Sequence, residues 1–176
     1  MYRPHWIQFS WNLKLLPAEA PGHSVKSVEL RKAGPDDAMA VWTFMERAYT
    51  TDLAWGMTLA ERLKKLKDAV FEGIEDKNVE FWVADHGRKI IGGSGLLLDA
   101  GAPVQMVTGV CVMEEYRCRG LGGWLLHASL KRLAETGLES AAVVTRSNTH
   151  AARYLYRKFS SAPAQAEAFP EIKQFA

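Results

Sequence analysis

Glu115-Tyr-Arg-Cys-Arg-Gly-Leu-Gly-Gly-Trp-Leu-Leu126 joins two arginines and three glycines to the start of a leucine-rich run. Glycine is costly inside a helix, so three of them at a helix start indicate a loop that the rest of the molecule or a ligand approaches closely. A strand is expected to end near Val112 and a helix to start near Gly120. The free N–H groups and the positive dipole end of such a helix bind anions.

The type of anion is narrowed by what surrounds this loop. Arg117 and Arg119 add charge-assisted donors, which favours a phosphate or pyrophosphate over a ligand-free surface turn. A Walker loop needs Gly-Lys-Ser/Thr, and the sequence has none. A dinucleotide fingerprint needs a third glycine where Leu125 stands, and an acid where the next strand ends as Val144-Thr-Arg146. Both nucleotide interpretations are therefore weakened.

Working outward, hydrophobic periodicity and turn residues predict the order β-α-α-β-β-β-α-β-α followed by a tail. The predicted strands are 25–31, 79–84, 90–98, 104–112 and 141–145, and the main helices start near 38, 59 and 121. Short turns join the three middle strands, so they should form an antiparallel meander. The unit from 104 to 145 should be parallel and right-handed. The fold class is thus α/β, with a mixed, mostly antiparallel sheet flanked by helices.

A last helix is expected after Asn148, with Ala152, Leu155, Tyr156 and Phe159 on one face. We expect two parts in the chain: an N-terminal extension over residues 1–24 and a domain over residues 25–176. Within this extension, residues from Ile7 to Leu15 alternate between apolar and polar, the period of a half-buried strand. That strand belongs either to the domain's own sheet, to a floppy arm, or to the interface of a homodimer.

Composition excludes several classes of protein. The 176 residues suit a domain with a real core, and a net charge of +2 indicates neither a nucleic-acid nor a membrane partner. Cys111 and Cys118 form no C-x-x-C pair, so neither a disulfide framework nor a metal site is expected. There is no apolar run of the roughly 18 residues that a membrane span needs, and no signal-peptide pattern. We expect a cytoplasmic protein.

Two motifs resemble those of a known family. Arg117-x-x-Gly120-x-Gly122 is similar to the R/Q-x-x-G-x-G/A signature of the GNAT superfamily of N-acetyltransferases. Asn148-x-x-Ala151 and Leu155-Tyr156-x-Lys158 resemble that family's second signature, N-x-x-A…L-Y-x-K. The order of elements also fits, from about residue 25 to residue 159. The family usually continues with a glycine and a phenylalanine where this chain has Phe159-Ser-Ser161, and its last two strands are hard to find in 160–176.

The resemblance implies that acetyl-coenzyme A (acetyl-CoA) is a co-substrate, bound where two central strands splay apart. The pantetheine arm would pair with the backbone of Val110, Cys111 and Val112, and an N–H near Val112 would stabilise the oxyanion. The pyrophosphate would lie on N–H groups of Arg117, Cys118, Arg119, Gly120, Leu121, Gly122 and Gly123. Asn148 is carried over as a cofactor-binding residue from the second signature. Tyr156 would protonate the departing thiolate, although by spacing alone it would be a core aromatic residue.

The acceptor implied by the resemblance is a primary amine of a small molecule or a peptide. Its groove should be built by residues 49–57, the meander and the tail; the alternative for 49–57 is a connector around a buried Trp55. No acid lies in the strand 104–112 to serve as a base, and Thr108 or Gln105 could only position a water. The flanking Glu80 is expected to be solvated, and Cys111 to be an inert thiol. The alternative function is a regulatory module that binds coenzyme A without catalysis.

Overall fold

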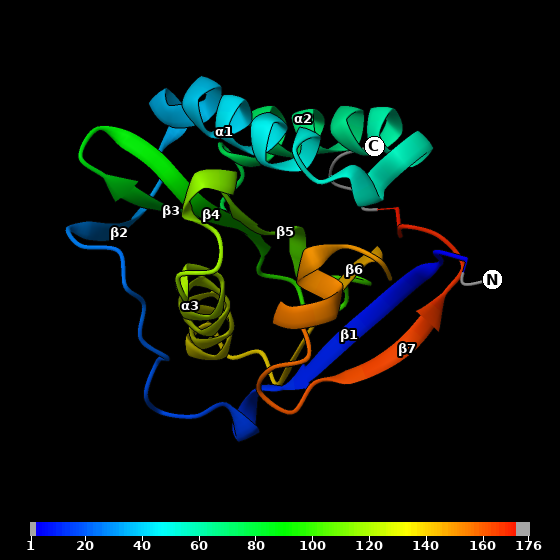
Figure 1. Cartoon of the computed structure of the whole chain (residues 1–176). Coiled ribbons are helices and arrows are strands. Elements are labelled where there is room, and N and C mark those ends of the chain that lie inside the picture. The colour runs from blue at the N-terminus through cyan, green and yellow to red at the C-terminus, as the bar shows by residue number, and fades with distance from the viewer. Residues whose placement is uncertain (1–2, 172–176) are drawn as a thin grey trace.

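The computed structural model describes residues 3–171, which form two sheets and three main helices (Figure 1). The first sheet is antiparallel throughout, in the order β2 (Val28–Lys32), β3 (Val79–His86), β4 (Lys89–Leu97) and β5 (Met106–Val112). The second has the order β6 (Ser140–Arg146), β1 (Trp6–Asn12) and β7 (Ala162–Ala166). The predicted meander is β3–β4–β5. The fold class predicted from the sequence is confirmed.

Helices cover both faces of the first sheet. α1 (Ala38–Thr50) and α2 (Leu59–Gly73) lie on one face, and α3 (Leu121–Glu135) lies on the other (Figure 1). The glycines of β4 allow this close packing. A Cβ on Gly92 would lie 2.6 Å from Leu125 of α3, and one on Gly93 would lie 3.3 Å from Phe44 of α1. Successive residues of a strand face opposite sides, so each glycine accommodates a different helix.

β5 and β6 begin side by side and then separate. The Gln105 N–H donates to the Ala142 carbonyl at 3.2 Å, and the Ala142 N–H donates to Gln105 Oε1 at 2.9 Å. Within residues 3–171 no strand ladder joins β5 to β6. The expected parallel pairing is therefore limited to these two hydrogen bonds, because the strands diverge beyond them. Gln105 Nε2 also donates to the carbonyls of Asp99 and Ala102, so Gln105 holds the structure together and does not position a water.

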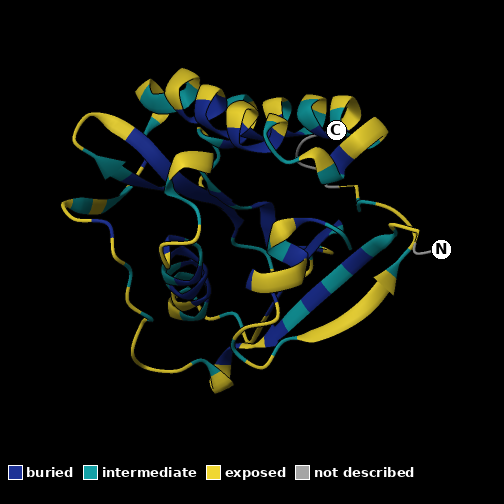
Figure 2. Cartoon of the chain, in the orientation of Figure 1, coloured by how far each residue is buried: buried dark blue, intermediate teal, exposed yellow. Residues whose placement is uncertain are grey.

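The N-terminal strand β1 is the inner strand of the second sheet. It pairs antiparallel with β6 on one side and with β7 on the other, so that Phe9 faces Val143 and Pro163. Its side chains alternate between buried and half-buried, whereas most of β7 is exposed (Figure 2). Of the alternatives for this strand, the structure shows the domain's own sheet. A homodimer stays a prediction, as does the boundary between 24 and 25.

The last predicted helix forms after Asn148, but it is shorter than its apolar face suggested. Only a single π-helical turn forms, over Ala151–Leu155. Its first N–H groups are met by Thr149, not by Asn148: Thr149 Oγ1 accepts the Ala152 N–H at 3.2 Å. Phe159 and Ser160 then take φ angles of 60° and 58°, a left-handed conformation that ends the turn and directs the chain into β7. Part of the tail, residues 172–176, lies outside the described residues.

Glu80 is a second correction, because it is not a solvated strand-end charge. Its side chain is 5% exposed and accepts two hydrogen bonds of 2.8 Å from Arg132 of α3, and one of 2.9 Å from Trp82 Nε1. These donors stabilise the carboxylate and lower the pKa of Glu80 to about 2. The ion pair ties α3 to β3.

Over residues 3–171 there is no helix with the length and apolar character needed to cross a bilayer. The same residues hold no group of three or more His, Cys, Asp or Glu side chains arranged to bind a metal ion.

Candidate active site

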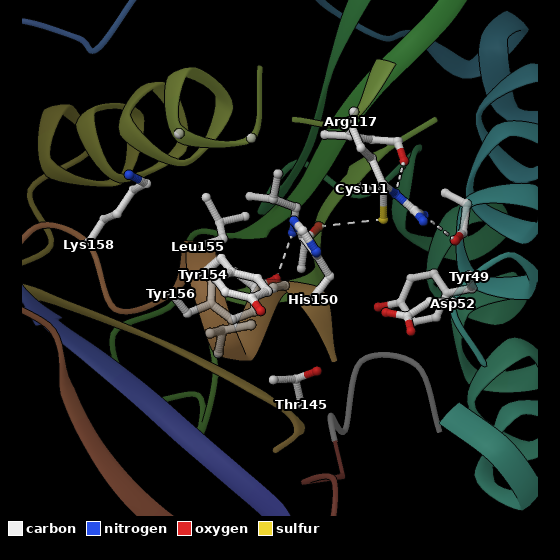
Figure 3. A pocket seen from close by; sticks show the side chains of 18 of the residues that line it. Tyr49, Asp52, Cys111, Arg117, Thr145, His150, Tyr154, Leu155, Tyr156 and Lys158 are labelled. Carbon is white, nitrogen blue, oxygen red and sulfur yellow. Dashed lines mark hydrogen bonds between the residues drawn. The ribbon is translucent and has the colours of Figure 1, made fainter. Parts of the chain in front are cut away.

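A cavity of about 760 Å³ opens where β5 and β6 diverge (Figure 3). Nine of the residues predicted from the sequence line it: Val110, Cys111, Val112, Arg117, Cys118, Gly120, Gly122, Gly123 and Tyr156. Three predicted residues do not. Leu121 is buried in the core, the Arg119 guanidinium lies 5.6 Å from the centre of the Tyr116 ring, and the Asn148 amide oxygen is buried without a hydrogen-bond partner.

The Tyr156 hydroxyl meets the backbone of the splayed strand. The Val110 N–H donates to it at 3.0 Å, and among residues 3–171 no acceptor takes the hydroxyl's own proton. Burial raises the pKa of Tyr156 well above its usual value, so the group stays protonated. The rings of Phe9 and Trp11, from β1, lie 5.8 and 6.1 Å from the Tyr156 ring and fix its orientation. Tyr156 is thus both a packed aromatic and a proton donor aimed at the cleft.

Gly109 makes this contact geometrically feasible. It has φ of 68°, and a Cβ at this position would lie 2.5 Å from the Tyr156 oxygen. The β4–β5 register shifts next to this point, between Ser94 and Leu96, where Thr108 Oγ1 accepts the Gly95 N–H at 2.7 Å. Thr108 therefore shapes an irregularity in the sheet and is not placed to hold a water.

The other side of this irregularity is held by a buried arginine. Arg62 Nη2 donates to the Val107 carbonyl at 2.9 Å and to the Tyr49 hydroxyl at 3.2 Å. The Tyr49 hydroxyl in turn donates to the Thr108 carbonyl. Burial raises the pKa of Tyr49 to about 12, so its hydroxyl remains a donor. Tyr49 and Tyr156 thus form hydrogen bonds to the residues of β5 on either side of Gly109. No motif in the sequence pointed to Arg62, since its role depends on the packing of α2.

Backbone groups of β5 remain for a ligand. Because strand groups alternate in direction, Val112 presents its N–H and C=O to the same side as Val110. Tyr156 occupies the N–H of Val110, and Arg117 Nε donates to the C=O of Val112 at 3.2 Å. The C=O of Val110 and the N–H of Val112 are the two groups left facing the cleft.

Arg117 is more deeply engaged than its motif suggests. Besides Val112, its Nη2 donates to the Ala48 carbonyl at 2.9 Å and to Thr51 Oγ1 at 3.1 Å. The guanidinium therefore ties the end of α1 to the end of β5, with most of its donors used. The cation that extends toward the α3 N-terminus is instead Lys158 (Figure 3), whose Cε would lie 3.6 Å from a Cβ on Gly123. The L-Y-x-K motif contained this residue.

The glycine loop has the conformation of an anion site. Gly120 takes φ of 88° just before α3, and the first helical hydrogen bond runs from the Trp124 N–H to the Gly120 carbonyl at 3.2 Å. The N–H groups between them lack helical partners. The Arg117 N–H is used by the Glu114 carbonyl at 3.2 Å, so the available groups begin one residue later than the sequence suggested.

The wall opposite β5 was predicted from the sequence only as a segment, residues 49–57, and not residue by residue. Tyr49, Asp52 and Trp55 line the cavity from the end of α1, across from Thr145, His150 and Tyr154 (Figure 3). The sequence favoured two interpretations for 49–57, a binding loop and a connector with a buried Trp55. Trp55 is 6% exposed and also lines the cavity, so one segment does both. Cys111 is buried, which raises the pKa of its thiol to about 12 and keeps it unreactive.

Comparisons with known proteins agree with this geometry. Residues 42–160 match the sequence model of the acetyltransferase (GNAT) family. No curated protein sequence matches significantly. A GCN5-related N-acetyltransferase from Ralstonia eutropha superposes with a TM-score of 0.61 at 23% identity, over 82% of this chain and 99% of that one.

Longer proteins share the fold as well. A GCN5-related N-acetyltransferase from Sphaerobacter thermophilus (TM-score 0.58, 20% identity) and a Drosophila protein (TM-score 0.60, 14% identity) each align with 93% of this chain. The alignments cover 50% and 49% of those two chains, so the present chain spans about half of their length.

Proposed function

This chain belongs to the acetyltransferase (GNAT) family, and we propose that it moves the acetyl group of acetyl-CoA to a primary amine of a small molecule or a peptide. The observation that carries this proposal is the Tyr156 hydroxyl, held by the Val110 N–H at the cleft between β5 and β6 with its own proton free to be donated.

The cleft offers partners for two parts of acetyl-CoA. The C=O of Val110 is an acceptor for an amide N–H of a pantetheine arm, and the N–H of Val112 is a donor for a carbonyl oxygen at the thioester end of that arm. The free N–H groups from Cys118 to Gly123 and the Lys158 ammonium suit a pyrophosphate. This assignment keeps the predicted loop but moves the main side-chain charge from Arg117 to Lys158.

The reaction has two further requirements, stabilisation of an oxyanion and protonation of a thiolate. Attack on the thioester gives an oxyanion, which the Val112 N–H would stabilise. Coenzyme A then leaves as a thiolate, and the Tyr156 hydroxyl gives it a proton. Because the Val110 N–H donates to the same oxygen, it also stabilises the tyrosinate that forms for a moment.

We expect Tyr156→Phe to lower turnover by about 100-fold, a typical contribution of an acid catalyst. Acetyl-CoA affinity should change by less than about threefold, since the ring and its packing stay. Release of free thiol measures turnover, and calorimetry measures affinity. Tyr154→Phe is the matched control, because Tyr154 lines the same cavity but is 63% exposed. Unchanged turnover of Tyr156→Phe on an accepted amine would contradict the role.

The second candidate is a coenzyme A-binding regulatory module. It is favoured by the absence of an acid on β5, whose residues are MVTGVCV. A panel of primary amines separates the two functions. Thiol release with any of them supports the enzyme, whereas tight acetyl-CoA binding without release on every amine supports the module.

A further inference from the structure

We propose that Asp52 is the acceptor-binding acid of this site: it receives the amine as an ammonium ion and takes the proton that the amine must lose before attack. The inference rests on the proposed acetyl transfer and extends it to a residue and an acceptor class. The acceptors it predicts are alkylamines that arrive positively charged.

Asp52 is oriented by its own turn. It follows α1, and its Oδ1 accepts the Ala54 N–H at 3.1 Å, which fixes the carboxylate while its second oxygen remains available. The side chain points into the cavity from the α1 side, next to Tyr49, and faces the wall that carries Tyr156 and His150 (Figure 3).

The charge of Asp52 has no counterpart inside the protein. It is the only carboxylate among the described residues that line the cavity, and no ion pair involving it occurs within residues 3–171. Of the cavity's two long cations, Arg117 is bonded to three protein oxygens and Lys158 lies beside the α3 N-terminus. A cationic ligand would supply the missing charge.

Aromatic rings beside Asp52 suit the same ligand. The Tyr49 and Trp55 rings lie with centroids 4.9 Å apart and planes tilted by 36°, and both line the cavity. The Arg62 guanidinium lies 5.5 and 6.0 Å from the two centroids, so the ligand uses the ring surface that faces the cavity. Alkylammonium groups bind aromatic faces through the ring quadrupole, and their methylene groups pack on the same surface. A carboxylate next to aromatic faces therefore favours an alkylammonium and disfavours an acidic acceptor.

The proton balance closes with Asp52 in this role. Asp52 accepts one proton of the ammonium, and the freed lone pair forms the C–N bond as the carbonyl electrons move to oxygen. The C–S bond then breaks, its electron pair leaves with sulfur, and Tyr156 protonates the thiolate. The nitrogen gives up a second proton, which restores Tyr156, and one proton remains on the new amide. The proton on Asp52 passes to solvent.

His150, on the wall opposite Asp52, is the competing candidate for the proton acceptor in this cavity. Its ring lies 4.9 Å from that of Tyr154, which is itself 63% exposed, so it belongs to the rim. A variant of each residue distinguishes the two.

The test measures thiol release by the full chain with two acceptor amines. One is an alkyldiamine, which is charged at neutral pH, and the other is an arylamine, which is not. Asp52→Asn should lower kcat/KM for the alkyldiamine by about 100-fold and for the arylamine by less than about threefold. Asp52→Ser keeps an acceptor for Ala54 without the charge and should behave alike. His150→Gln, and Glu114→Gln on the exposed surface, should resemble the wild type.

Each outcome has one meaning. Equal losses on both acceptors, or none, overturn the role of Asp52 while the acetyl transfer stands. A selective loss in His150→Gln assigns the role to His150 and likewise overturns it. A wild-type chain that binds acetyl-CoA but releases thiol with no amine overturns the proposed function, and the inference with it. Melting temperatures of all variants show whether a loss reflects unfolding.

Discussion

Gly109 has no side chain, and this allows the Tyr156 hydroxyl to reach β5. Its left-handed φ of 68° and the 2.5 Å that a Cβ would leave to the Tyr156 oxygen both require glycine there. Arg62 and Tyr49 hold the preceding residues, so the irregular turn of the strand is fixed from both sides. The position of the proposed acid is therefore set by the backbone as much as by Tyr156 itself.

Gly109→Ala is expected to lower turnover by at least about tenfold, because the tyrosine must move to make room. Strain at a left-handed residue should also cost stability, about 1 kcal/mol in thermal unfolding. Gly22→Ala is the control, since a Cβ there meets nothing within 4 Å.

A double-mutant cycle checks the cause of the loss. In the Tyr156→Phe background the clashing oxygen is gone, and Gly109→Ala should then have a smaller effect on turnover. Additive effects would mean that the loss arises elsewhere.

At the scale of elements, the ion pair between β3 and α3 supports the loop that precedes α3. Arg132 lies near the C-terminal end of α3 and holds Glu80 with two hydrogen bonds of 2.8 Å. The pair fixes the helix at one end, while the glycine loop occupies its other end. A rigid helix keeps the N–H groups of that loop converging on one point.

This pair predicts a pH dependence of stability. The pKa of Glu80 is lowered to about 2 from 4.5, so its contribution is fully present above pH 4.5 and is lost as the pH falls toward 2. The shift corresponds to about 3 kcal/mol at neutral pH. We expect Glu80→Gln to lower the free energy of unfolding by roughly that amount at pH 7 in denaturant titrations, and by progressively less as the pH falls below about 4.5.

Glu135→Gln provides the comparison, because Glu135 lies 3.7 Å from the same Arg132 but is 52% exposed. It should change stability by less than about 0.5 kcal/mol. A similar loss in both variants, or one independent of pH, would contradict the buried pair.

The elements differ in how far the sequence could predict them. The strand–loop–helix around Gly120 was predictable, because local glycines and a leucine face specify it. The length of the helix after Asn148 was not, since Ala152, Leu155 and Tyr156 have helical spacing although the helical turn ends at Leu155. A charged residue in a motif also does not reveal its hydrogen-bond partners. Arg117 donates to the carbonyl of Ala48, which belongs to another helix. Asp52 became a candidate only when the fold placed it in the cavity.

On the scale of the whole molecule, the chain closes on itself through β1. The alternation from Ile7 to Leu15 predicted a buried face, but a period identifies a face and not its partner. The partners are β6 and β7, far along the chain. Phe9 and Trp11 of β1 pack on Tyr156, and Trp11 Nε1 donates to the Lys158 carbonyl at 2.9 Å. The first strand thus supports the catalytic turn directly.

Phe9→Ala should therefore affect both stability and catalysis. Phe9 has no exposed surface, and its loss should cost about 3–5 kcal/mol of unfolding free energy. At a temperature where the variant remains folded, its turnover should fall more than its acetyl-CoA affinity. Ser10→Ala, on the half-buried face of the same strand, is the control and should alter neither. A stable fold with normal turnover in Phe9→Ala would contradict this support.

During synthesis of the chain, β1 emerges long before the strands with which it pairs. β1 ends at Asn12 and its first partner begins at Ser140, so about 130 residues separate them. At about 5–20 residues per second, the ribosome needs roughly 6 to 26 seconds to bridge that gap. Throughout this time an apolar strand has no native edge to join, which invites pairing with other nascent chains. We expect chaperone dependence during translation to track the apolar residues of β1 rather than those of the first sheet.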